Sequence, residues 1–367
     1  MKAKCKRKDL AEAIGIVERA VAVKSTMNIL EGIYIEARNG QLQFLSNNLE
    51  LGLDCKIDAE IEQEGAVVVK ANLFSTAVKK LPDFEEYAQI EVNENDTIIL
   101  SCGNAKFDFS TAKADEFPRL ASVESEKSFK IKESLLKSMI RQTIYAIAQT
   151  DIKPQLSGIY FEIKDGIFHM VGCDGYRLAI RKEKIEGTED LSFILPGKTA
   201  KELLSIIGED DYEVEILLSA KNALLKLKKC MMVTRLIEGE YLDYNSVCKH
   251  KNTLVITTET KKILDSIDRA SLIVNETTKA HVVLKIEDDN VFINCETVMG
   301  KVKDKFSVDM SGEPIEIAFN PRYLMDAFKN CDCSEIKFSF STPVNPTTIE
   351  PAEGDSFLYI VLPVRMR

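Results

Sequence analysis

Hydrophobic and polar residues follow the same order three times along the chain. Each third opens with a strand-like run that leads into an amphipathic helix, as in FKIKESLLKSMIRQTIYAIA. In that segment Leu136, Ile140 and Ile147 fall on one helical face, and Lys137 and Arg141 lie off it. CKRKDLAEAIGIVERAV and LVITTETKKILDSIDRASLIV repeat the arrangement. The pattern predicts an equivalent strand and helix at the start of each third.

Two alternating strands joined by a tight turn come next in each third. The pairs Asn39-Gly40, Asp165-Gly166 and Asp289-Asn290 occupy the turn position, and all are suited to a positive φ. A second strand and helix follow, and further alternating strands close each copy. Equivalent elements recur at about 125 residues, the size of a whole domain. We therefore predict an α+β fold of three similar domains, residues 1–125, 126–249 and 250–367, each with two helices and about eight strands.

Composition places the chain among globular proteins. Its 367 residues are 45% hydrophobic and 29% charged, and no apolar run approaches the roughly 20 residues of a membrane helix. The basic N-terminus lacks the apolar core of a signal peptide, so we expect a cytoplasmic protein that does not bind membranes. The nine cysteines form no C-x-x-C pair, and most lie in apolar strand-like runs, which favours buried free thiols.

Charge is distributed unevenly. The net charge is −10, yet the polar faces of all six predicted helices carry lysine or arginine. A solvated surface explains any one such helix, but six with the same bias indicate that acidic and basic residues occupy different faces. A domain of this size has a diameter of roughly 30–35 Å, so six in a ring leave a hole of about 30 Å. Duplex DNA, about 20 Å wide, would pass through it and be held by salt-sensitive phosphate contacts.

Several local segments, together with the threefold repeat, resemble the bacterial DNA polymerase III beta subunit family of sliding clamps over essentially the whole chain. They are FPRL (Phe117 to Leu120), the DGYRLAI turn, EGEYLDY (Glu238 to Tyr244) and the C-terminal LYIVLPVRMR. The resemblance implies a ring-shaped homodimer that encircles duplex DNA as a non-catalytic processivity factor, without a cofactor or a metal. It also implies a dimer contact between the first domain of one chain and the third domain of the other, formed by Lys106, Phe107, Phe109, Leu272 and Ile273.

The family resemblance further implies a pocket for short peptide motifs between the second and third domains. Its predicted residues are Leu156, Cys173, Gly175, Tyr176, Arg177, Leu178, Leu242, Val247, Asn320, Tyr323, Val344, Val361, Leu362, Pro363, Val364, Arg365 and Met366. We expect the aliphatic members to form a floor, with Tyr176 and Arg177 at a rim that can form hydrogen bonds. Tyr176, Cys173 and Leu242 stand where the family commonly has histidine, threonine and proline, so the preferred motif is expected to differ.

Partners and DNA contacts follow from the same resemblance. Expected partners are duplex DNA, a second copy of the chain, the DNA polymerase III catalytic subunit, the clamp loader, and repair polymerases or mismatch-repair proteins that carry the motif. The residues expected to face DNA are Lys24, Lys79, Lys80, Lys137, Arg141, Lys198, Lys201, Lys262, Arg269 and Arg322. The alternative is a peptide-binding scaffold of the same fold that does not encircle DNA.

Catalytic signatures are weak. PGKT (Pro196 to Thr199) resembles the end of a phosphate-binding loop, but Ser192 stands where that loop needs glycine, so we expect a helix start there. The three histidines, His169, His250 and His281, are not at metal-ligand spacing, and Cys331-Asp-Cys333 has no accompanying pair. With no nucleophile–base set, the sequence does not indicate an enzyme.

Overall fold

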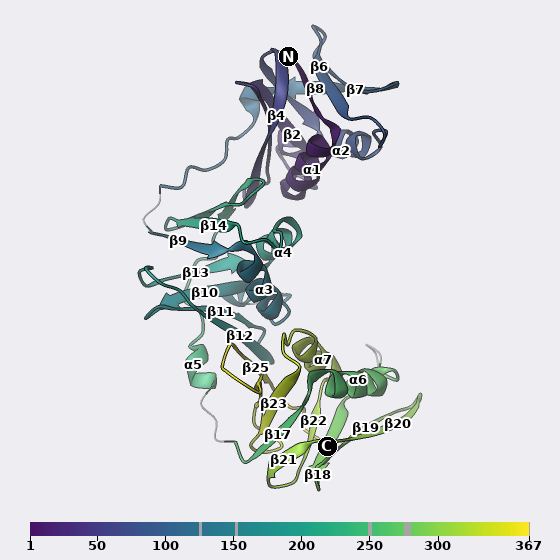
Figure 1. Cartoon of the computed structure of the whole chain (residues 1–367), viewed down its shortest axis with the longest axis vertical. Coiled ribbons are helices and arrows are strands. Elements are labelled where there is room, and N and C mark those ends of the chain that lie inside the picture. The colour runs from purple at the N-terminus through teal and green to yellow at the C-terminus, as the bar shows by residue number, and fades with distance from the viewer. Residues whose placement is uncertain (125–126, 151–152, 249–251, 275–279, 367) are drawn as a thin grey trace. The chain divides into compact units, whose positions relative to one another are not determined.

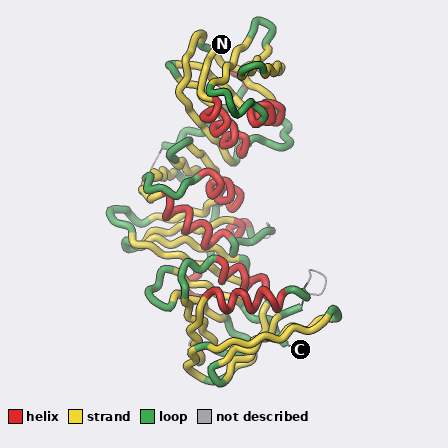
Figure 2. Tube along the Cα trace, turned by 45° about the vertical axis from the view of Figure 1, so that its right-hand side comes forward, coloured by secondary structure: helices red, strands yellow, loops and turns green. Residues whose placement is uncertain are grey.

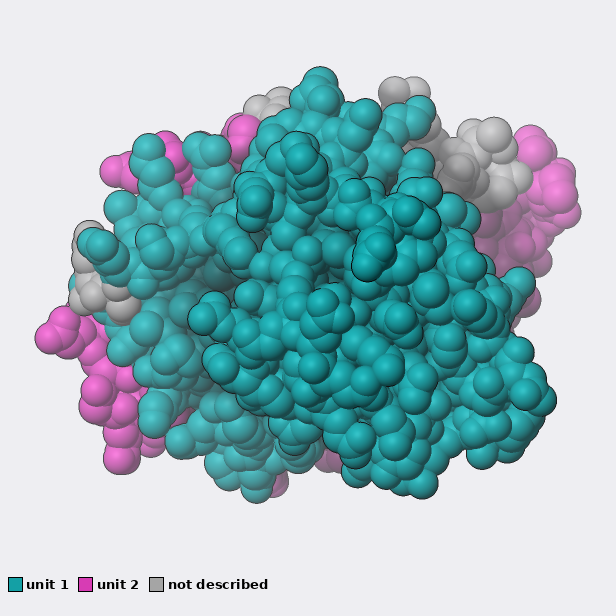
Figure 3. Space-filling model, turned by 90° about the horizontal axis from the view of Figure 1, so that it is seen from above, with its two compact units in different colours: residues 1–136, 205–236 teal, residues 137–204, 237–367 magenta. Residues whose placement is uncertain are grey.

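The computed structural model describes residues 1–124, 127–150, 153–248, 252–274 and 280–366. Both predicted domain boundaries and His250 lie outside these residues. The described chain forms two compact units, residues 1–136 with 205–236 and residues 137–204 with 237–367 (Figure 3). No helix in the described part is long and apolar enough to cross a membrane.

The predicted repeat is visible in the order of the elements (Figure 1). The first copy contains β1 (Lys2–Lys6), α1 (Arg7–Val17), β2 (Gly32–Arg38), β3 (Gln41–Asn47), β4 (Leu51–Gln63), β5 (Gly65–Lys70), α2 (Ala71–Lys79), β6 (Tyr87–Val92), β7 (Thr97–Cys102) and β8 (Ala105–Lys113). The second contains β9 (Lys127–Lys132), α3 (Glu133–Ile144), β10 (Gly158–Lys164), β11 (Ile167–Cys173), β12 (Arg177–Lys184), β13 (Leu191–Pro196), α4 (Gly197–Ile206), β14 (Glu213–Leu218), β15 (Asn222–Lys226) and β16 (Met231–Arg235), followed by the short α5 (Tyr244–Val247).

The third copy has the same order with one added short strand. It contains β17 (Leu254–Glu259), α6 (Thr260–Ser271), β18 (Val282–Glu287), β19 (Asn290–Thr297), β20 (Gly300–Ser307), β21 (Asp309–Gly312), β22 (Ile315–Phe319), α7 (Pro321–Lys329), β23 (Glu335–Phe340), β24 (Thr347–Pro351) and β25 (Phe357–Val361). PGKT spans the end of β13 and the start of α4, as expected for a helix start.

Strand pairing in the first unit continues from the first copy into the second. One twelve-stranded sheet runs β1-β6-β7-β8-β5-β2-β3-β4-β16-β15-β14-β9, and β4 and β16 join the two copies. α1 and α2 lie side by side in this unit (Figure 2). Leu10, Ile14 and Phe74 are fully buried, as the apolar stripes of the two helices require.

The second unit has a nine-stranded and a four-stranded sheet. The larger runs β13-β10-β11-β12-β25-β24-β23-β17-β21, and β12 and β25 join the second copy to the third. The smaller runs β20-β19-β18-β22. α6 and α7 pack side by side over a core that includes Ile263, Leu324 and Phe338 (Figure 2).

Two of the three predicted hairpin turns are confirmed, and the third is wrong by one residue. Asn39-Gly40 and Asp165-Gly166 both have positive φ. In the third copy Asn290 already pairs with Glu287, and Asp288-Asp289, with φ of 50° and 57°, form the turn. Aspartate tolerates the left-handed region because its short side chain bonds locally, so two adjacent aspartates can take the place of a glycine-containing pair.

Candidate functional site

The seam between β12 and β25 is the centre of the candidate site. Arg177 pairs with Val361 and Leu178 with Ile360 in an antiparallel register. Beyond β25 the chain stays close to both neighbouring sheets. The N–H of Leu362 donates to the carbonyl of Tyr176 over 2.9 Å, and the N–H of Val364 donates to the carbonyl of Ala318 over 2.7 Å. The C-terminal segment is thus fixed by backbone hydrogen bonds beside the DGYRLAI turn.

The turn before β12, which we call the docking turn (Asp174 to Tyr176), is held by its own aspartate. Asp174 Oδ1 accepts the N–H groups of Tyr176 and Arg177 over 2.8 and 3.0 Å. Gly175 has φ of 90°, which favours glycine. Tyr176 is 62% exposed, and its ring stacks on that of Tyr323 with centroids 6.2 Å apart. The turn therefore presents an aromatic side chain in a defined position.

Arg177 differs from the expectation of an open rim. Its side chain is only 10% exposed, and its Nε and Nη1 donate to Asp174 and Asp326 over 3.0 and 2.5 Å. The guanidinium carbon lies 5.4 Å from the ring centroid of Tyr145 and 4.6 Å from that of Tyr323. The cation is engaged inside the protein because the aspartates and rings surround it. Arg177 supports the surface from beneath.

An apolar cluster lies next to the docking turn and contains several of the residues predicted to form the floor. Cys173, Leu178 and Ile360 are buried in it, and Leu156, Leu242 and Val247 pack against it half-buried. Tyr241 and Tyr244, from the EGEYLDY segment, belong to the same cluster, and Tyr241 stacks on Tyr160 with centroids 4.8 Å apart.

Burial governs the titration of this cluster. It raises the pKa of the Cys173 thiol above its ordinary 9.0, so the side chain is neutral at pH 7. Burial likewise raises the pKa of Tyr241 and lowers that of His169 on β11. These groups carry no charge at neutral pH, and the cluster is suited to bind apolar side chains.

Other predicted members form the more exposed part of this surface. Val344, Val364 and Met366 are 62%, 38% and 42% exposed. Asn320 is engaged as the N-cap of α7, where Oδ1 accepts the N–H of Arg322 over 3.0 Å. Leu362 and Pro363 are half-buried and Arg365 is exposed. The seventeen predicted residues thus lie just before β10, on β11, β12 and the turn between them, on and just before α5 and α7, in the β23–β24 loop, and on β25 and the C-terminal segment, all in one unit.

Several residues of the site were absent from the prediction, and Asp174 is one of them. Asp326 and Tyr145 flank Arg177, and Tyr241 underlies the turn. The sequence carries a signal for Tyr241, since EGEYLDY is a recognisable segment. Asp326 follows Tyr323 by three residues on α7, so the two share a helical face, but nothing local connects that face to residue 177.

The basic residues predicted to face DNA lie on or beside helices, and several already contact carboxylates. Lys79 pairs with Glu18, Arg141 with Asp332, and Arg269 with Asp304. Lys262 donates to the carbonyl of Ser307 over 2.9 Å. Lys24, Lys80, Lys198, Lys201 and Arg322 are exposed, and Lys137 is half-exposed. The charge offered by the helices is therefore partly compensated within the protein.

The residues predicted for the dimer contact occupy two separate places. Lys106, Phe107 and Phe109 lie on β8, where the two rings stack with centroids 6.5 Å apart. Leu272, 79% exposed, and half-buried Ile273 follow α6. In the described residues β20 ends its sheet, and β8 pairs with β5 only through residues 111–113, which leaves the outer edge of 105–110 unpaired.

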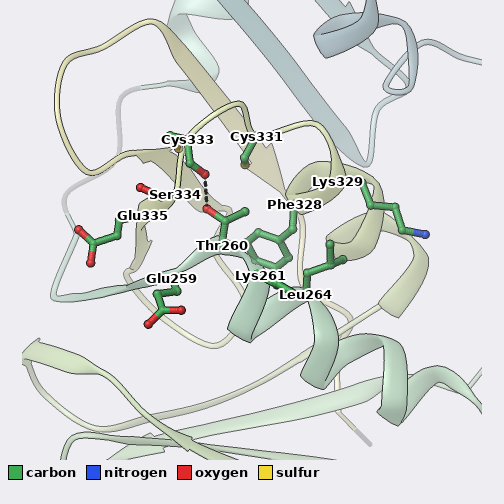
Figure 4. Close-up of a pocket in the computed structure, with 10 residues that line it drawn as sticks. All are labelled: Glu259, Thr260, Lys261, Leu264, Phe328, Lys329, Cys331, Cys333, Ser334 and Glu335. Atoms are coloured by element: carbon green, nitrogen blue, oxygen red, sulfur yellow. Dashed lines mark hydrogen bonds between the residues drawn. The ribbon is translucent and has the colours of Figure 1, made fainter.

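The other chemical candidates do not assemble into a reactive site. A cavity of about 600 Å³ at the start of α6 and the end of α7 contains Cys331 and Cys333 among its ten lining residues (Figure 4). The hydroxyl of Thr260 donates to the carbonyl of Cys333 over 2.8 Å, and burial raises the pKa of both thiols. The described part of the chain contains no cluster of three or more histidine, cysteine or carboxylate side chains able to hold a metal.

Comparison with known proteins places all three copies in one family. Models of the DNA polymerase III beta subunit match residues 1–121 as its N-terminal domain, 130–243 as its central domain and 246–365 as its C-terminal domain. The beta sliding clamp of Bacillus subtilis strain 168 is 32% identical over all of both chains. A crystal structure of the DNA polymerase sliding clamp from Bacillus subtilis covers both chains fully, with 30% identity and a TM-score of 0.96. A putative DNA polymerase III beta subunit from Eubacterium rectale gives 32% identity and a TM-score of 0.93 over 99% of each chain.

Proposed function

Because the chain belongs to the DNA polymerase III beta subunit family, we propose that it acts as a sliding clamp, a ring-shaped homodimer that encircles duplex DNA and tethers the replicative polymerase. The observation that carries this proposal is the pairing of strands between consecutive copies. β4 pairs with β16 and β12 with β25, so that Gly52 lies opposite Val233 and Leu178 opposite Ile360. One kind of seam is used twice within the chain.

A third seam of the same kind remains to be formed, and the repeat specifies its partners. In the third copy Lys301 occupies the position that Gly52 and Leu178 hold in the first and second copies. Each of these three residues pairs with the seventh residue after the hairpin turn of its own copy. Asp108 on β8 occupies the position of Val233 and Ile360 in the closing strands. We infer that β20 of one chain pairs with β8 of a second chain, with Lys301 opposite Asp108. An opposite-charge pair across strands favours this register.

Side-chain packing at the β12–β25 seam supports the same arrangement. Tyr145, the first residue after α3, packs edge to face on Tyr359 of β25 with centroids 5.7 Å apart. Leu272 is the first residue after α6, and Phe107 is the equivalent of Tyr359 in the closing strand of the first copy. Exposed Leu272 of one chain would therefore cover Phe107 of the other chain. Two chains joined by two such contacts form a closed ring of six repeats. A heterologous contact that repeats by rotation can close in this way.

A closed ring makes retention on DNA topological. The helix cations then need to supply only weak, non-specific phosphate contacts, which permits sliding. An overall charge of −10 disfavours DNA binding over the rest of the surface. The proposed residues are those named above, from Lys24 to Arg322.

The docking turn and the apolar cluster next to it supply the second half of the function. We propose that they bind short extended segments with apolar side chains from the polymerase catalytic subunit, the clamp loader and repair proteins. The half-buried aliphatic residues of the cluster give apolar area, and exposed Tyr176 gives an aromatic anchor, the combination common at binding hot spots. No covalent step is required.

Solution mass and DNA topology test the proposal together. We expect a dimer by analytical ultracentrifugation at micromolar concentration, and slower loss from nicked circular DNA than from the same DNA after linearisation. A monomer, or equal loss from circular and linear DNA, would exclude the clamp and favour a peptide-binding scaffold that does not encircle DNA.

A further inference from the structure

We propose that Asp326 on α7 is a positioning residue that holds the docking turn in the geometry its partners bind. The inference rests on the proposed function, because it concerns the same surface. Asp326 is not among the residues that the family resemblance implies for this site. Its side chain is 30% exposed and accepts a hydrogen bond from Nη1 of Arg177 over 2.5 Å.

The contact with Asp326 is the outer link of a short chain of contacts. Arg177 donates from Nε to Asp174 Oδ2 over 3.0 Å, while Asp174 Oδ1 accepts the N–H of Tyr176 over 2.8 Å. Asp174 is thus held through both carboxylate oxygens, one by the turn it forms and one by Arg177. Charge-assisted hydrogen bonds of this kind are stronger than neutral ones and restrict direction. The carboxylate of Asp326 therefore limits the orientation of the whole turn.

α7 also contacts the turn through a second residue on the same face. Tyr323, three residues before Asp326, stacks on Tyr176 and lies 4.6 Å from the guanidinium carbon of Arg177. Residues three apart on a helix are neighbours, so Asp326 and Tyr323 grip the turn as a pair. The helix itself is fixed by its Asn320 cap and by Leu324 and Phe328, both buried in the core. A rigid helix thereby supports a turn whose other hydrogen bonds are local, apart from the one that Leu362 donates to the carbonyl of Tyr176.

Removal of the Asp326 charge should weaken binding without removing any contact to the bound segment. Arg177 and Asp174 would keep their own ion pair, but only the ring of Tyr323 would then connect them to α7. A partner would then have to order the turn as it binds, and ordering one or two side chains lowers affinity by roughly tenfold. Substitution of a residue that touched the bound segment directly would instead weaken binding without making the docking turn more mobile.

The experiment compares two isosteric changes, one within α7 and one in the segment that follows it. Asp326→Asn removes the negative charge that Arg177 pairs with and leaves only a neutral acceptor. The matched control, Asp332→Asn, removes the charge that pairs with Arg141. Asp332 also accepts hydrogen bonds from Ser138 and Gln142 over 3.1 and 3.0 Å, so it connects the third copy to α3 without touching the docking turn. Full-length proteins are used, and the probe is a fluorescein-labelled synthetic peptide that copies the C-terminal segment of the replicative polymerase of the same organism. Anisotropy gives the dissociation constant.

Amide hydrogen exchange in the free proteins supplies a readout that does not involve the probe. We expect faster exchange at the N–H groups of Tyr176 and Arg177 in Asp326→Asn than in wild type or Asp332→Asn, with peptide affinity reduced roughly tenfold. Asp326→Glu, which keeps the charge, should recover most of the affinity. In a Tyr176→Ala background Asp326→Asn should cost little more, because its effect passes through Tyr176.

Each contrary result has a distinct meaning. Wild-type exchange at the turn together with wild-type affinity in Asp326→Asn overturns the positioning role. Equal losses in Asp326→Asn and Asp332→Asn also overturn it, because they indicate general loosening of the fold. If wild-type protein does not bind the peptide at all, the proposed docking function fails, while the exchange data still decide what Asp326 does to the turn.

Discussion

Gly175 and Leu49 show how one backbone scaffold serves two different surfaces. Both have positive φ, 90° and 72°, at equivalent places before β12 and β4. Asn48 accepts the N–H groups of Glu50 and Leu51, as Asp174 accepts those of Tyr176 and Arg177. The middle copy therefore gains its distinctive chemistry from side chains placed on a turn that the first copy shares.

Substitution of Gly175 by alanine tests the strain at this turn. An added Cβ would meet no atom within 4 Å, so the cost comes from the left-handed backbone alone, about 1–2 kcal/mol. We expect a lower melting temperature and weaker peptide binding. The control, Gly15→Ala, makes the same change inside α1, also with no atom within 4 Å, and should stabilise the protein by up to about 1 kcal/mol. Equal effects of the two variants would contradict a conformational role for Gly175.

At the same scale the sequence predicted the apolar members of the site but not their supports. Cys173, Leu178 and Leu242 lie in strand-like runs or in a recognisable segment, and the structure brings them together. Arg177 was expected at a rim, yet the carboxylate of Asp326, 149 residues away, holds it inside. No periodicity or turn signal reports a contact over such a separation, because side-chain pairing depends on tertiary packing.

Strands and hairpins were the most predictable elements, and their partners across copies were the least. Alternation and turn chemistry identify β2–β3 and β10–β11 from local sequence. They do not reveal that β4 joins β16 or that β12 joins β25, because either edge of an antiparallel hairpin can accept a neighbour. The turn between β19 and β20 also differs from its counterparts. Glu296 and Thr297 belong to β19, and Val298-Met299 form a two-residue turn, shorter than that of the other copies.

The proposed pairing of β20 with β8 makes a sharp prediction about charge. Lys301→Glu and Asp108→Lys should each weaken the dimer, because each places like charges opposite one another, at about 0.2–1 kcal/mol per contact. A ring has two such contacts, so the change in the free energy of dimerisation is twice that of one contact. The double variant should recover dimerisation. Sedimentation over a dilution series measures all three.

The control for this test is Lys285→Glu. It makes the same charge change on β18, an inner strand of the same sheet, and should leave the dimer unchanged. Lys301→Glu also removes the pairing of Lys301 with Glu296 on β19, so the double variant is compared with Lys301→Glu. A double variant that dimerises no better than Lys301→Glu would reject this register, even if the ring closed through the same two strands.

For the whole molecule, the proposed role requires a protein that is acidic overall yet retains DNA. Reversal of Lys198 and Lys201 on α4 to glutamate should shorten the lifetime on nicked circular DNA much more at 50 mM than at 300 mM salt. Loss of two phosphate contacts lowers the slope of log affinity against log salt by about 2. Lys164→Glu with Lys184→Glu, which alters exposed lysines on β10 and β12, is the matched control. A loss that did not vary with salt would count against an electrostatic role for α4.

The two inner seams differ from the proposed outer ones in one mechanical respect. β4 and β16, like β12 and β25, are parts of a single polypeptide, so separated edges stay tethered and meet again quickly. β20 of one chain and β8 of the other have no covalent connection, so they can diffuse apart once they separate. A force applied anywhere around the closed ring would therefore open it first where the backbone is discontinuous. Each chain thus contributes two seams that stay together and one seam, between β20 and β8 of the other chain, that can open.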